Sequence, residues 1–71
     1  MANPPLPPMP RQILYEIKRN GAYVRVCAIC ADTGIEAVMV GPATVGLFSL
    51  KQNAARKLAY VIEKQRQERR R

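Results

Sequence analysis

The chain has 71 residues, with 12 Lys and Arg against 5 Asp and Glu, no His, and a net charge of +7. That length allows one small domain whose core is only marginally sufficient, with little room for a cleft that encloses a substrate. No apolar run approaches the ~20 residues of a transmembrane helix, and prolines stand where an export signal needs apolar residues, so we expect a cytoplasmic protein with reduced cysteines and no membrane contact.

Composition divides the chain into three segments. Residues 1–11 are rich in proline, which favours polyproline II and cannot enter a sheet interior, so they are predicted to form a disordered leader. Residues 12–64 are the predicted folded domain, and residues 65–71 are a basic tail. Positive charge attracts nucleic acid and acidic partners, but at a helix C-terminus it also complements the helix dipole and aids solubility.

A hairpin is predicted at the start of the domain. Apolar and polar residues alternate from Ile13 onward and again over residues 22–30, which is typical of half-buried strands. Between these runs, Asn20-Gly21 favours a two-residue type I′ turn. The register that this turn predicts pairs Ile17 with Val24, Tyr15 with Val26, Ile13 with Ala28 and Glu16 with Arg25.

A third strand and a helix complete the prediction. Residues 31–34 form a turn, and residues 35–40 form a strand that Gly41-Pro42 ends, because proline cannot donate to a ladder. Ser49 is predicted to cap a helix, with Gln52 completing a capping box, and the helix is expected to end near Arg66. Its apolar stripe consists of Leu50, Ala54, Leu58, Val61 and Ile62.

The elements in this order predict an α+β fold of the β-β-β-α type. The sheet is three-stranded and antiparallel, its middle strand is central, and one C-terminal amphipathic helix packs on one face. We call that face the inner face and the opposite one the outer face.

The sequence contains no pattern that is typical of a catalytic site. General acid–base and nucleophilic catalysis need a positioned proton carrier or an activated nucleophile, but the chain has no histidine, and capping accounts for its one serine, Ser49. The carboxylates are scattered, and Gly41 and Gly46 lack the lysine and Ser/Thr of a P-loop. We expect no enzyme, no catalytic or cofactor-binding residue, no cofactor and no small-molecule substrate.

The Cys27-Ala28-Ile29-Cys30 motif suggests zinc or redox chemistry, and its geometry argues against both. Residues three apart on a strand point to opposite faces, so the two sulfurs are expected to diverge. We therefore expect free cysteines and no metal, with a zinc shared between two subunits through Cys27 as the exception left open.

The predicted outer face is about half apolar, although an open sheet face in a soluble monomer is mostly polar. A second copy of the chain is the simplest cover, so we predict a non-enzymatic interaction module that self-associates, as a symmetric dimer. The residues predicted to form this surface are Leu14, Tyr23, Cys27, Ile29, Val38 and Val40. Acidic and basic residues interrupt them, namely Glu16, Glu36, Lys18 and Arg25.

Nucleic-acid binding is the alternative hypothesis. Some DNA-binding domains share this strand order with a covering helix and lay the sheet into the major groove, although that is an analogy of fold alone. The predicted contacts are Lys18, Arg25, Arg56, Lys64, Arg69, Arg70 and Arg71.

Several short motifs carry a resemblance to a known family. They are the hairpin through Gly21, the Asp32-Thr33-Gly34 turn, Val40-Gly41-Pro42-Ala43, and Leu50-Lys51 leading to Arg56-Lys57-Leu58-Ala59-Tyr60-Val61. Over about residues 12–64 the chain resembles a family of short, uncharacterised alphaproteobacterial proteins, a domain of unknown function. Some members of such families carry enzyme names, including serine hydroxymethyltransferase, which this chain is far too short to be. The resemblance implies a compact domain and no site residues.

Overall fold

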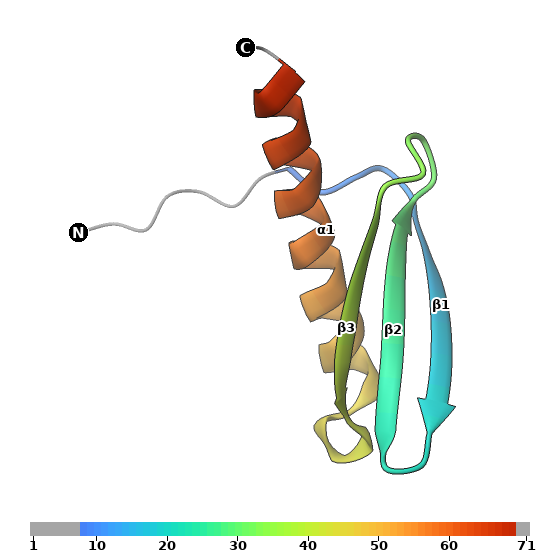
Figure 1. The fold of residues 1–71 in the computed structure, drawn as a ribbon. Coiled ribbons are helices and arrows are strands. Elements are labelled where there is room, and N and C mark those ends of the chain that lie inside the picture. Colours follow the sequence, from blue (N-terminus) through green and yellow to red (C-terminus); the bar gives the residue numbers. More distant parts are fainter. Residues whose placement is uncertain (1–7, 70–71) are drawn as a thin grey trace, which may run out of the picture.

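Two layers, a sheet and a helix, make up the part of the protein that the computed structural model describes, residues 8–69 (Figure 1). Strands β1 (Ile13–Asn20), β2 (Tyr23–Cys30) and β3 (Glu36–Pro42) lead through a 3₁₀ turn, η1 (Ala43–Val45), into helix α1 (Leu47–Arg69). The sheet is antiparallel in the order β1-β2-β3, so the predicted β-β-β-α fold and its central strand are confirmed. Most of the predicted leader, residues 1–7, lies outside the described residues.

The predicted hairpin register is wrong by two residues. Asn20 stands opposite Tyr23, which leaves Gly21 and Ala22 as the turn. Gly21 has φ 63°, while no described residue other than glycine has a positive φ, and a type II′ turn needs glycine at its first central position alone. All eight residues of β1 are then matched with all eight of β2.

A shift of two residues leaves every side chain on its predicted face but changes its partner. Glu16 lies opposite Cys27, and Lys18 lies opposite Arg25. The favourable pair of Glu16 with Arg25 is therefore absent, and two like charges face each other in its place.

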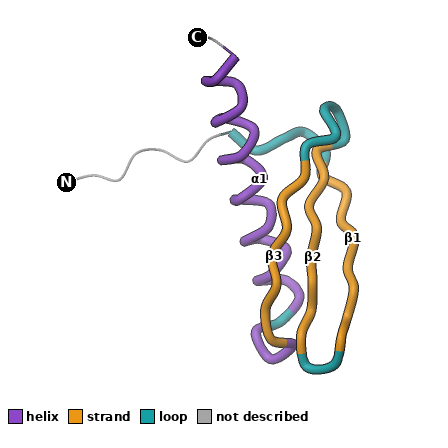
Figure 2. The backbone as a smooth tube through the Cα atoms, in the orientation of Figure 1, coloured by secondary structure: helices purple, strands orange, loops and turns teal. Residues whose placement is uncertain are grey.

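Helix α1 covers β2 and β3 more than β1 (Figures 1 and 2). Its buried residues lie between Leu50 and Ala59, and Leu58 is fully buried. The inward residues of β3, Ala37 and Met39, stand opposite the inward residues Ala28 and Val26 of β2. The buried core consists of Val26, Ala28, Cys30, Ala37, Leu50, Ala54 and Leu58.

The end of β3 differs from its prediction, because Gly41 and Pro42 belong to the strand. Proline is tolerated there because β3 is an edge strand. Gly41 is buried, and a Cβ atom at this position would lie 2.7 Å from Cδ2 of Leu50. Glycine at this position therefore lets the first turn of α1 sit directly on the end of the sheet.

The predicted helix cap is also wrong. The helix begins at Leu47, after Gly46 has closed the η1 turn at φ 96°, and the Leu50 N–H donates to the Gly46 carbonyl at 3.2 Å. Ser49 thus lies within the first turn of α1. The helix continues to Arg69, past the predicted end near Arg66, and its last turns project beyond the sheet (Figure 1). No helix within residues 8–69 has both the length and the apolarity to cross a membrane.

Candidate interaction surfaces

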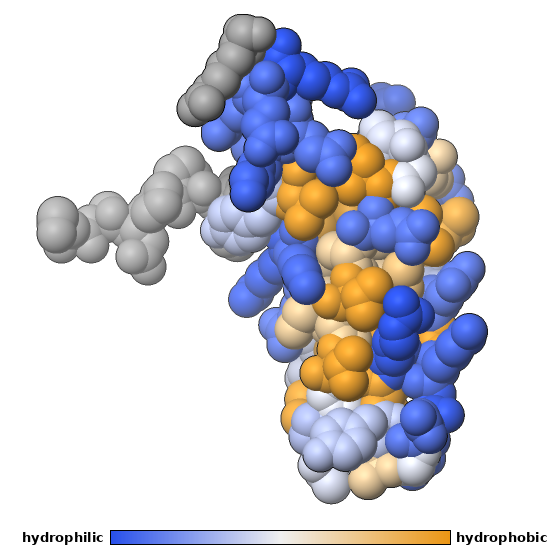
Figure 3. Space-filling model, viewed as in Figure 1, coloured by the Kyte–Doolittle hydropathy of each residue, from blue (hydrophilic) through white to orange (hydrophobic). Residues whose placement is uncertain are grey.

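The outer face of the sheet carries exposed apolar side chains, and none of the described elements covers it. Leu14 is 49 % exposed, and Tyr23 and Val40 are each 60 % exposed. Ile29 and Val38 lie between them and are half-buried. Figure 3 shows apolar surface in a band along the strands, with hydrophilic side chains beside it.

The charged residues of the outer face form an acidic group and a basic group. Glu16 and Glu36 lie toward the β2–β3 turn, whereas Lys18 and Arg25 lie opposite each other near the hairpin turn. Within residues 8–69 the one ion pair is on the helix, between Arg66 and Glu63, at 3.8 Å. All four charged side chains of the outer face are therefore without an ion-pair partner in the described part of the chain.

Cys27 needs a correction as a surface residue. It lies on the outer face as predicted, but it is only 1 % exposed, because neighbouring side chains cover it. Its Sγ donates a hydrogen bond to Oε1 of Glu36 at 3.0 Å. This bond, then burial and the charges of Glu36 and Glu16, raises the pKa of the Cys27 thiol. Cys27 is thus engaged within its own domain and is not available as a contact.

Cys30 lies in the buried core on the inner face, so the two sulfurs diverge as predicted. Hydrogen bonds from the side chain and backbone of Thr33 lower the pKa of the Cys30 thiol. No cluster of three or more His, Cys, Asp and Glu side chains stands ready for a metal ion in the part of the chain that the structure describes.

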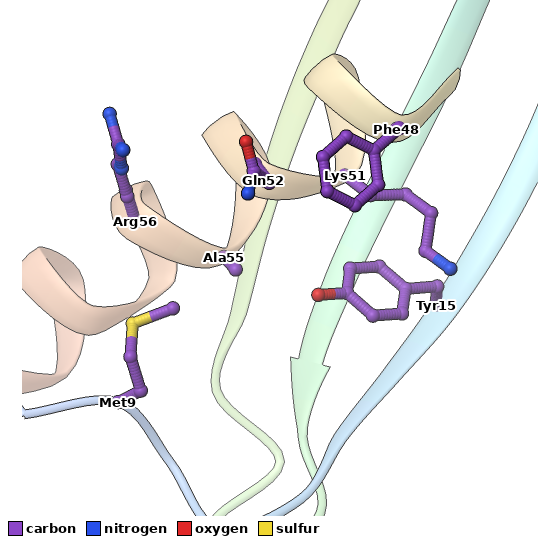
Figure 4. Close-up of a pocket in the computed structure, with 7 residues that line it drawn as sticks. All are labelled: Met9, Tyr15, Phe48, Lys51, Gln52, Ala55 and Arg56. Atoms are coloured by element: carbon purple, nitrogen blue, oxygen red, sulfur yellow. The ribbon is translucent and has the colours of Figure 1, made fainter.

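A groove between β1 and α1 is a feature that the sequence reasoning missed. It has a volume of about 350 Å³, and its lining residues are Met9, Tyr15, Phe48, Lys51, Gln52, Ala55 and Arg56 (Figure 4). Nζ of Lys51 stands 4.6 Å from the centre of the Tyr15 ring, a cation–π distance. Phe48 at the mouth is 73 % exposed, and the neighbouring inner-face residue Ile17 is 44 % exposed.

The groove has a simple geometric cause. A helix with its side chains is ~10 Å wide, whereas three strands at ~4.8 Å spacing present a wider face. One helix therefore covers two strands, and the inner side of the third remains partly open. The sequence predicts one helix and three strands, and this difference in width is the signal from which the groove could have been predicted.

The two edges of the sheet also differ. The Ala31 N–H donates to the Gln12 carbonyl at 3.1 Å, which sets the alternation of the β1–β2 ladder. Even-numbered residues of β1 therefore bond to β2, and the backbone groups of its odd-numbered residues point away from the sheet. On β3, the outward carbonyl of Val38 accepts a hydrogen bond from Nζ of Lys57 at 2.9 Å.

The predicted nucleic-acid contacts do not gather on one surface. Lys18 and Arg25 lie together on the outer face of the sheet. Arg56, Lys64 and Arg69 are exposed on α1, in the other layer. Arg70 and Arg71 lie outside the described residues.

Fold and surfaces together define a small β-β-β-α domain in which one face and one edge of the sheet are covered by no element of residues 8–69. The chain belongs to the DUF6898 family, a domain of unknown function, whose family model matches residues 10–65. No curated protein and no solved structure matches it. The matched residues nearly coincide with the domain predicted at residues 12–64.

Proposed function

We propose that this domain is a non-enzymatic interaction module that binds a second copy of itself through the outer face of its sheet. The observation that carries the proposal is the exposure of Leu14, Tyr23 and Val40 on a face that no described element covers. An antiparallel sheet with one solvated face normally alternates apolar-in and polar-out. Here large apolar residues point out along all three strands.

The arrangement of charge favours a second copy as the partner. One end of the outer face is acidic, where Glu16 and Glu36 stand in adjacent cross-strand rows, and the end near the hairpin turn is basic, where Lys18 and Arg25 share a row. Consider a two-fold axis that lies between two such faces and runs across the strands. It brings the acidic end of one copy against the basic end of the other. The face is thus complementary to itself.

The size of the domain gives this association an energetic reason. A folded region this short has a marginal core, and small domains often gain stability by oligomerisation. Burying an aliphatic side chain contributes about 1.5–3 kcal/mol. Covering Leu14 and Val40 in each copy would therefore add appreciably to a stability that is normally about 5–15 kcal/mol.

The chemistry of the thiols is consistent with a binding role. The Cys27 thiol is covered and engaged with Glu36, and Cys30 lies in the core. Both side chains thereby contribute to the structure of the sheet.

The test is the oligomeric state of Val40→Glu, measured by sedimentation over a range of concentrations. Val40 is largely exposed in one copy, so the substitution leaves the monomer folded but places a carboxylate where the partner sheet would lie. We expect Val40→Glu to sediment as a smaller species than the wild type at the same concentration, because the face-to-face contact is lost. Tyr60→Glu is the matched control, because Tyr60 is similarly exposed but lies on α1. A wild type that is monomeric at high micromolar concentration contradicts the proposal.

Nucleic-acid binding is a second candidate, favoured by one observation. Lys18 and Arg25 lie directly opposite each other with no described acidic partner, and such a cation pair fits a phosphate group. Binding of this kind weakens steeply as salt rises. A salt-sensitive complex with duplex or single-stranded nucleic acid, lost in Arg25→Gln while the protein stays monomeric, would support this candidate over self-association.

A further inference from the structure

The free edge of β1 presents unpaired backbone groups. The alternation of the ladder turns the N–H and C=O groups of Ile13, Tyr15, Ile17 and Arg19 away from β2. No hydrogen bond within residues 8–69 reaches these groups from a side chain or from another segment. In Figure 1, β1 forms the edge of the sheet farther from α1. An open edge of this length is a template for a further strand.

We propose that β1 pairs antiparallel with β1 of a second copy, centred on Ile17, so that two sheets join into one of six strands. This goes beyond association through the outer face, because it uses a different surface and a different kind of bond. The two-fold axis runs perpendicular to the sheet. Both helices therefore lie on the same side of the joined sheet, and each remains over its own β2 and β3.

The charges of β1 select this register. Pairing centred on Ile17 places Glu16 opposite Lys18 of the second copy, and it does so twice because the pairing is symmetric. Centring on Glu16 or on Lys18 would place like charges opposite each other, which is destabilising. Centring on Tyr15 leaves both charges opposite uncharged residues, and centring on Arg19 pairs two arginines. Only the register centred on Ile17 satisfies both signs.

The same register gives the like-charged pair Lys18 and Arg25 an acidic neighbour. Lys18 has Arg25 directly across on one side. The second copy brings Glu16 to its other side, so Lys18 stands between Arg25 and a carboxylate. The joining of two edges therefore offsets the Lys18–Arg25 repulsion.

The inner side of the joined strands is complementary as well. Ile17, which is 44 % exposed in one copy, packs against Ile17 of the other copy. Tyr15 falls opposite Arg19, a pairing in which a guanidinium group can lie on an aromatic ring. In the dimer, the two joined β1 strands then lie between the groove of one copy and the groove of the other.

Charge exchange provides the first test. Within one chain, Lys18→Glu creates an opposite-charge pair with Arg25, so the monomer should be at least as stable as the wild type. Across the proposed edge it places two carboxylates opposite each other, and we expect the dimer dissociation constant to rise by about tenfold or more. The double variant Glu16→Lys/Lys18→Glu restores opposite charges across the edge, and we expect it to restore the dimer.

A Val40→Glu background separates the two proposed interfaces. Face-to-face association is lost there, so a dimer that Lys18→Glu weakens and that the double variant restores depends on edge pairing alone. If Lys18→Glu leaves the dissociation constant unchanged, or if the double variant fails to restore it, edge pairing in this register is wrong.

Ile17→Pro is the second test, because it removes a backbone N–H that points away from β2. Proline is tolerated at such an edge position, and Ile17→Ala is the control that shortens the side chain but keeps the N–H. We expect the proline variant to lose the edge contact and to sediment as a smaller species than the wild type, whereas the alanine variant, which loses only the Ile17–Ile17 packing, should weaken the contact far less. Hydrogen exchange of the Ile17 amide should be slow in the wild-type dimer and fast on dilution to monomer. A proline variant of unchanged mass, or a fast-exchanging Ile17 amide in the dimer, overturns edge pairing. Val40→Glu then shows whether the face association stands by itself.

Discussion

The two edge strands of this sheet differ in how they are tied to the rest of the domain. β3 is held from several sides, since Lys57 bonds to its outward Val38 carbonyl, Leu50 packs against Gly41, and Glu36 accepts a hydrogen bond from Cys27. Pro42 also removes a donor from its outer edge. On the inner side of β1, Ile13 and Tyr15 pack against the margin of the core and Tyr15 also contacts Lys51, while along its edge no hydrogen bond within residues 8–69 reaches the outward backbone groups.

The difference follows from the position of one helix. Because α1 lies over β2 and β3, the core and the protected edge fall on one side of the domain. The other side keeps exposed apolar residues and unpaired backbone groups. Folding and association thereby depend on different strands, so substitutions on β3 and on β1 should affect different measurements.

Core packing should give the largest contrast between the two sides. Leu58→Ala removes a fully buried side chain over β2 and β3, and we expect a loss of about 2–5 kcal/mol in the free energy of unfolding. Ile17→Ala, on half-exposed β1, should cost about 1 kcal/mol. Urea denaturation at a concentration below that of association measures both. Equal losses would mean that β1 belongs to the core as fully as β3.

The contact of the helix with the end of β3 comes next. Gly41→Ala would bring a Cβ atom within 2.7 Å of Leu50 Cδ2, and overpacking of this kind costs about 1–3 kcal/mol. In a Leu50→Ala background the clash is absent, so there the same substitution should be nearly neutral. The double-mutant cycle from thermal or urea unfolding measures this coupling. Additive effects would contradict the proposed cause.

Lys57→Met tests the protection of the β3 edge. It removes the hydrogen bond to the Val38 carbonyl at 2.9 Å while keeping an unbranched side chain, so the loss of stability should be at most about 1 kcal/mol. The freed carbonyl should make β3 resemble β1, and light scattering should detect added self-association. Lys64→Met, on an exposed position of α1, is the control for lost charge and should not associate further.

The smallest expected effect concerns the Cys27 thiol. Its raised pKa in the folded protein means that it contributes stability below about pH 9.0, its ordinary value, and that this contribution is lost as pH rises through the folded value. Glu36→Gln should lower the pKa of Cys27 and weaken this alkaline loss. Thiolate absorbance, followed by pH titration in a Cys30→Ala background, measures the change.

Glu16→Gln is the matched control for that titration. Glu16 lies directly opposite Cys27 on β1, but the thiol donates to Glu36 of β3. The β1 substitution should therefore shift the pKa of Cys27 less than the β3 substitution. Equal shifts would show that both carboxylates act on the thiol through charge alone.

Local patterns were enough to predict the elements and the faces. The alternation from Ile13 through Cys30 sets which side chains share a face, and a two-residue turn at either position keeps that arrangement. The spacing of Leu50, Ala54 and Leu58 likewise predicts a helix with one apolar side. These features depend on residues close together in the chain, which is why they can be seen in the sequence.

Packing decided what those patterns left open. Registers that differ by two residues bury the same side chains, so the alternation does not choose between them. The type II′ turn at Gly21 and the full match of β1 with β2 determine the register. The position of α1 over β2 and β3 likewise depends on the close approach of Leu50 to Gly41. The groove beside β1 and the half-exposed side chain of Ile17 are consequences of that position. Contacts between strands also decide that Cys27 bonds to Glu36 and not to Glu16. Periodicity specifies the side of an element, whereas contacts between residues distant in sequence fix its partners, and only the tertiary structure supplies those contacts.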